Sequence, residues 1–106
     1  MNIILSTRFE TFRCSFHNQT IIASYRYLKH SFGIHMYSEF MKINAEWYLK
    51  IDDIPFSIYD WKNDISPIKQ SSTLIEWNVS SQSALSDVHL KFIEDFILNG
   101  KSLVNT

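Results

Sequence analysis

The stretch WYLKIDDIPFSIYDW, from Trp47 to Trp61, decides the fold, because it holds two apolar, β-prone runs on either side of Asp52-Asp53. The two aspartates offer a two-residue turn, but without the glycine that a type I′ turn prefers. A longer loop through Pro55 is the alternative reversal. Either way, the stretch predicts a β-hairpin.

Side chains alternate between two faces along a strand, and the residues of the hairpin follow that alternation. A third run from Thr73 to Val79 alternates in the same way and is predicted to pair beside the hairpin, and a short strand is expected at Ile3 to Leu5. The predicted apolar side of this sheet comprises Ala45, Trp47, Leu49, Ile51, Ile54, Phe56, Ile58, Ile75, Trp77 and Val79.

Two segments carry apolar residues at helical spacing. The first includes Ile22, Tyr25, Leu28 and Phe32, which predicts a helix from about Thr20 to Phe32 that ends at Gly33. The second carries an apolar stripe from Leu85 to Ile97 and predicts a helix from about Ala84 to Leu98, ended by Asn99-Gly100.

The order of these elements predicts an α+β fold, with a small antiparallel sheet of three to four strands packed with two helices that cover one face. The chain has 106 residues, of which 45% are hydrophobic, so residues 1–106 are expected to form a single globular domain.

Composition excludes several classes of protein. Ten Lys and Arg residues stand against eleven Asp and Glu residues, and the net charge of -1 gives no general support for nucleic-acid binding. The single Cys14 excludes an intramolecular disulfide and suits a reducing compartment. The N-terminus lacks the features of a signal peptide, and no run is long enough to cross a membrane. We therefore expect a soluble, cytoplasmic protein that does not bind membranes.

The residues Ile58 to Lys62, I-Y-D-W-K, together with Phe32-Gly33, Glu46-Trp47 and the W-N-V of Trp77 to Val79, resemble small proteins found in bacteriophage genomes. The resemblance covers about residues 20–98. It implies a phage accessory protein that acts in the host cell cytoplasm and binds or inhibits a host protein, for example one of a defence system. It implies no catalytic residue. The chain departs from the pattern in its loops, where Asp52-Asp53 stands in place of a glycine-containing turn and Ser80 to Ser83 in place of a glycine-rich segment.

Residues suited to contact a protein partner are Met36, Tyr37, Tyr48 and Tyr59. Tyr48 and Tyr59 share the polar side of the hairpin, and Met36 and Tyr37 belong to the apolar segment Ile34 to Ile43. Aromatic residues and methionine are enriched in protein interfaces. The alternative is that both faces of the sheet are covered and these residues are core. We expect a non-enzymatic interaction module, with homodimer formation through the same sheet.

A second hypothesis is a nucleic-acid-binding accessory protein. Arg8, Arg13, Arg26 and Lys29 interleave with Phe12, Tyr25 and Tyr27, a mixture that suits stacking on single strands. On a helix, however, exposed basic residues are ordinary, so this hypothesis ranks second.

Catalytic and metal-binding patterns are weak. The carboxylates Asp52, Asp53, Asp60 and Asp64 are able in principle to hold a divalent metal or to act as acid and base, but aspartate also favours turns, which is the preferred interpretation. His17, His30, His35 and His89 lack zinc-ligand spacing, and Cys14 sits in a phenylalanine-rich run that is typical of core. We therefore expect no catalysis, no metal and no cofactor.

Overall fold

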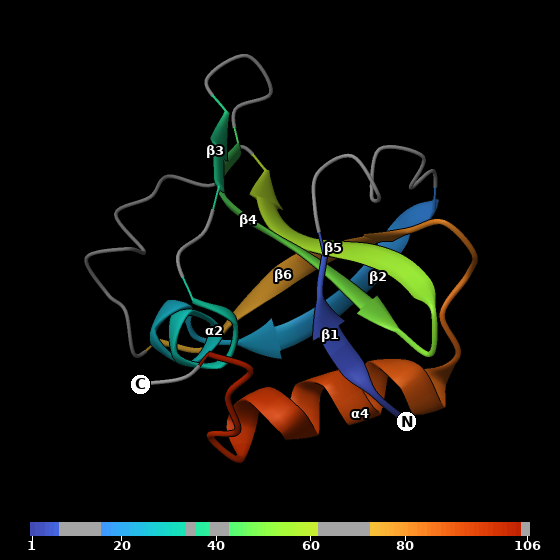
Figure 1. The fold of residues 1–106 in the computed structure, drawn as a ribbon. Coiled ribbons are helices and arrows are strands. Elements are labelled where there is room, and N and C mark those ends of the chain that lie inside the picture. The colour runs from blue at the N-terminus through green and yellow to red at the C-terminus, as the bar shows by residue number, and fades with distance from the viewer. Residues whose placement is uncertain (7–15, 34–35, 39–42, 62–72, 105–106) are drawn as a thin grey trace.

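The computed structural model describes residues 1–6, 16–33, 36–38, 43–61 and 73–104, and the side chains of residues 16–18, 36–38, 43, 44 and 61 lie outside this description. The described ranges form an α+β fold (Figure 1). Its elements are β1 (Ile3–Leu5), β2 (Phe16–Ala23), α2 (Tyr25–Phe32), β3 (Met36–Ser38), β4 (Ile43–Ile51), β5 (Ile54–Trp61), β6 (Ile75–Ser81) and α4 (Asp87–Leu98).

The described strands form one antiparallel sheet in the order β1-β4-β5-β6-β2, and β3 pairs with β4 off this path. The α+β class and the two helices are confirmed. The prediction of three to four strands was too low, because β2 and β3 were not recognised as strands. The short β1 matches the predicted strand.

The predicted hairpin is confirmed as β4 and β5, joined by a tight turn in which Ile51 pairs with Ile54. Both turn residues have positive φ, 48° for Asp52 and 67° for Asp53. This is the backbone of a two-residue type I′ turn made without glycine, which aspartate tolerates better than most residues. Pro55 is therefore the second residue of β5 and not part of a longer loop.

The predicted start of the first helix was wrong, because Thr20 to Ala23 belong to β2. There Ile21 and Ala23 are buried while Thr20 and Ile22 are exposed, which is the two-residue period of a strand. The helix begins only after Ser24, whose side chain accepts a hydrogen bond from the Tyr27 backbone at 3.2 Å.

Both helices end as predicted. Gly33, with φ 86°, ends α2, and its amide donates to the Lys29 carbonyl. At the end of α4, Gly100 (φ 72°) donates to Ile97 and Lys101 donates to Phe96, which is a Schellman motif. Helix α4 begins three residues later than predicted, at Asp87.

One face of the sheet packs against the helices and is called the core face. It carries Trp47 and Trp77, whose rings meet edge to face at a centroid distance of 5.7 Å. The Tyr25 ring of α2 lies beside the Trp47 ring at a centroid distance of 6.0 Å, and Phe32 of α2 stacks on Phe96 of α4 at a centroid distance of 5.9 Å. In Figure 1, α4 runs below the sheet and α2 lies at the left, where β2 ends. The core face includes all the strand residues that were predicted to be apolar and inward, and those fully buried on it are Ala45, Leu49, Ile51, Phe56, Ile58 and Val79.

The opposite side of the sheet is called the outer face. Register places Glu46 beside Tyr59, Tyr48 beside Ser57, and Ser57 beside Ser80 on this side. Neither described helix packs on it.

Candidate functional site

Tyr48 and Tyr59 lie on the outer face, as the alternation predicted. The Tyr48 hydroxyl donates to Glu46 Oε1 at 2.6 Å, and Glu46 pairs across the strands with Tyr59. Tyr48 is half-buried, but Tyr59 is only 8% exposed. Burial raises the pKa of the Tyr59 phenol, and the negative charge of Glu46 raises it further. The structure thus brings the two tyrosines together around one carboxylate, with Tyr48 alone partly open to solvent.

The other two predicted contact residues, Met36 and Tyr37, have their backbone in β3, which pairs with β4. Their side chains lie outside the described residues. The remainder of the Ile34 to Ile43 segment, apart from Ser38 and Ile43, also lies outside them.

Exposure on the outer face is uneven. At its centre, Pro55 is buried, and so are Ser57 and Ser80, whose hydroxyls lie 2.6 Å apart. Toward the β2 edge, Ile22 is 42% exposed and Leu74, next to the start of β6, is 55% exposed. Register places Ile22 opposite Glu76, so Leu74 is the diagonal neighbour of Ile22 on the same face. Sequence reasoning missed this pair because Ile22 was assigned to a helix.

Two of the four predicted nucleic-acid contacts lie in the described chain. Arg26 and Lys29 are both exposed on α2, one helical turn apart. Arg8 and Arg13 lie outside the described residues. The structure therefore shows two solvated basic side chains on one helix.

The three described carboxylates of the predicted cluster, Asp52, Asp53 and Asp60, have separate structural roles. Asp52 and Asp53 form the hairpin turn, and Asp64 lies outside the described residues. Asp60 is 3% exposed, and its Oδ1 accepts a hydrogen bond of 2.7 Å from the Ala45 backbone amide, where the β4–β5 register shifts. Its carboxylate thus serves an amide at a bulge in the ladder. Within the described ranges, no group of three His, Cys, Asp or Glu side chains is placed to hold a metal ion.

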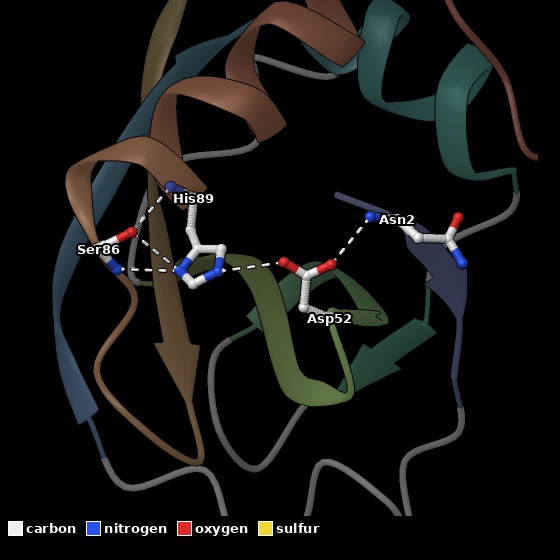
Figure 2. Close-up of polar contacts among 4 residues, drawn as sticks. All are labelled: Asn2, Asp52, Ser86 and His89. Atoms are coloured by element: carbon white, nitrogen blue, oxygen red, sulfur yellow. Dashed lines mark hydrogen bonds and ion pairs between the residues drawn. The ribbon is translucent and has the colours of Figure 1, made fainter.

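A polar cluster that the sequence did not reveal joins the turn to α4 (Figure 2). His89 lies between Ser86 and Asp52, with Nδ1 at 3.0 Å from Ser86 Oγ and Nε2 at 3.5 Å from Asp52 Oδ2. On the far side of Asp52, the Asn2 backbone amide donates to Oδ1 at 3.1 Å. These residues come from the position just before β1, the hairpin turn and the beginning of α4, so only the tertiary fold brings them together.

The order Ser, His, Asp suggests a nucleophile with its base, but the hydrogen bonds assign a different role. Ser86 is the N-cap of α4: its Oγ accepts from the His89 backbone amide at 3.1 Å, and its own amide donates to His89 Nδ1 at 3.2 Å. This is a capping box in which histidine replaces the usual Glu or Gln. Because Nδ1 accepts from a backbone amide, the ring proton is placed on Nε2, toward Asp52. The cluster caps the helix and ties it to the hairpin.

Of the other histidines and the cysteine, only His30 has a described side chain. His30 Nε2 lies 2.8 Å from the Gly100 carbonyl, an exposed contact between the ends of the two helices. The His17 side chain, His35 and Cys14 lie outside the described residues. In the part of the chain that the structure describes, no helix is long and apolar enough to span a membrane.

Comparison of the chain with protein-family models, with curated proteins and with solved structures found no match in any of the three.

Proposed function

We propose that this chain is a non-enzymatic protein-interaction module, a phage accessory protein that binds or inhibits a host protein, including one of a host defence system. The phage origin rests on the resemblance of the I-Y-D-W-K strand and its neighbouring motifs. The interaction role is supported by one structural observation: apolar side chains are exposed on the face of the sheet that carries neither described helix.

The proposed contact surface, called the Ile22–Leu74 patch, consists of Ile22 and Leu74 with Thr20 and Glu76 beside them. Ile22 and Leu74 are 42% and 55% exposed, and Thr20 and Glu76 are exposed polar residues from the same two strands. An apolar centre with a polar surround is the usual composition of a protein interface. Tyr48, half-buried on the same face two strands away, is a secondary contact in this proposal.

The experiment is affinity capture from bacterial lysate with the tagged protein and two variants. The double variant Ile22→Lys/Leu74→Lys places two charges on the patch, while Val88→Lys changes an equally apolar, 61% exposed residue of α4. We expect one stoichiometric host protein to be retained by the native chain and by Val88→Lys, and to be lost from the double variant.

Equal retention by all three proteins, or no stoichiometric protein at all, would contradict the proposal. Recovery of nucleic acid that salt releases, without a protein partner, would instead favour the role based on Arg8, Arg13, Arg26 and Lys29.

A further inference from the structure

The short edge strand β1 directs part of its backbone away from the sheet. The register pairs Ile4 with Lys50, the Ser6 amide donates to the Tyr48 carbonyl at 2.9 Å, and the Asp52 amide donates to the Asn2 carbonyl at 3.1 Å. Amide and carbonyl groups point alternately to the two sides of an antiparallel strand. The backbone amides and carbonyls of Asn2, Ile4 and Ser6 therefore point toward β4. Those of Ile3 and Leu5 point to the opposite side, where no described strand pairs with β1.

The two edges of the sheet differ in how they are protected. At the β2 edge, the Ile22 amide donates to the Glu94 carboxylate of α4 at 2.8 Å. A charged side chain therefore satisfies a backbone amide that would otherwise be open to another strand. Strand β1 carries no charge and no proline from Asn2 to Ser6, and Ile4 and Leu5 are 44% and 48% exposed. Natural edge strands usually carry charges, prolines or bulges that prevent pairing. Strand β1 lacks these features.

We propose that β1 is the seam of a homodimer, in which two copies pair antiparallel about a two-fold axis at Ile4. This register places Ile3 of one copy opposite Leu5 of the other, so residues with outward amides and carbonyls meet each other. It is also the register in which all three residues of β1 find a partner. A register shifted by one residue would place residues whose backbone amides and carbonyls point outward opposite residues whose backbone groups point toward β4.

The sequence of β1 favours a second copy of the same strand as the partner of its open edge. Ile4 meets Ile4 on the outer face, so two exposed apolar side chains cover each other, and the exposed Leu5 of one copy meets Ile3 of the other, which is already buried. Pairing of identical strands brings like charges together when the strand is charged. Residues Asn2 to Ser6 carry no charged side chain, so the two copies do not repel each other. Three residue pairs bury far less than the roughly 1,200–2,000 Å² of a stable interface, so the dimer is weak and concentration-dependent.

The seam is independent of the Ile22–Leu74 patch, because β1 and β2 lie at opposite ends of the strand order. Loss of the dimer and loss of the host partner are therefore separate outcomes.

Disulfide trapping tests the register. In a Cys14→Ser background, Ile4→Cys sets two thiols directly across the axis, in a non-hydrogen-bonded pair with Cα atoms about 4.5 Å apart. That separation suits a disulfide, whereas two Leu5→Cys thiols are offset by two residues along the strands and lie beyond the roughly 7 Å limit. We expect Ile4→Cys to cross-link at least about tenfold faster than Leu5→Cys and than Val88→Cys. Equal rates would overturn the register.

Sedimentation of the unmodified chain tests the dimer without any cysteine variant. We expect the average mass to rise with concentration toward that of two chains. Leu5→Pro removes an outward amide that β4 does not use, and an edge strand tolerates proline at such a position. This variant is expected to stay monomeric with an unchanged far-ultraviolet circular dichroism spectrum. A native chain that remains monomeric at its highest attainable concentration, or a dimer that survives Leu5→Pro in a folded protein, would overturn the proposal.

Discussion

Replacement of Trp47 by alanine tests whether the core is centred on the two tryptophans of the sheet. Trp47 is 3% exposed, its ring contacts Trp77 and Tyr25, and its indole N–H donates to the Gly33 carbonyl at 2.9 Å. Truncation of a buried tryptophan costs about 3 to 5 kcal/mol, and the Gly33 carbonyl loses a bond worth about 1 kcal/mol. Because such terms are not additive, we expect a loss of about 4 kcal/mol in the free energy of unfolding, which for a domain of this size lowers Tm by roughly 20 °C.

The assay is urea unfolding followed by far-ultraviolet circular dichroism, because the chain has three tryptophans and fluorescence would change with the substitution itself. Trp47→Phe keeps most of the ring contacts and loses the indole donor, so its cost should be about 1 to 2 kcal/mol. Tyr48→Ala on the outer face should cost about 1 kcal/mol. A loss below about 2 kcal/mol for Trp47→Ala, or one equal to that of Tyr48→Ala, would refute the assignment of the core face.

Two other predictions concern the turn and the outer face. Asp53→Gly should raise the free energy of unfolding by up to about 1 kcal/mol, because glycine adopts positive φ without strain. Asp52→Gly should give no such gain, because it removes the contacts to Asn2 and His89. The urea midpoints of the two variants test this difference, and an equal effect would contradict it. Above pH about 10, stability should fall as pH rises, because the pKa of Tyr59 is raised in the folded state and the unfolded chain releases its proton first. Tyr59→Phe should show a shallower alkaline loss in urea unfolding than the native chain, and an unchanged slope would argue against it.

The hairpin was predictable from sequence because its side-chain period is directly visible. Trp47, Leu49 and Ile51 alternate with polar residues, and a two-residue period over this length is typical of a half-buried strand and not of a helix. The end of α2 was equally readable, since Gly33 supplies a positive φ and is one of only two glycines.

The assignment of Ile22 to a helix shows where pattern reading fails. Its spacing from Tyr25 fits a helix, but the two residues lie on either side of the Ser24 cap, one in β2 and one in α2. What places Ile22 in a strand is the pairing of β2 with β6, more than fifty residues away, and a local pattern does not carry that information. The exposed patch and the polar cluster were missed for the same reason.

The polar cluster and the edge strand have a physical connection. A strand of three residues gains little from pairing alone, so β1 needs further attachment to keep a fixed geometry. Asp52 supplies it, because its amide donates to the Asn2 carbonyl and its carboxylate accepts from the Asn2 amide, while His89 holds the same carboxylate from α4. The side chain that occupies a strained position in the turn thus fixes the orientation of β1 relative to β4 and α4. Self-pairing of β1 requires that orientation, since a strand free to shift by one residue would turn Ile4 to the other face. Aspartate at position 52 therefore both reverses the chain and positions the edge strand, whereas glycine there would only reverse the chain.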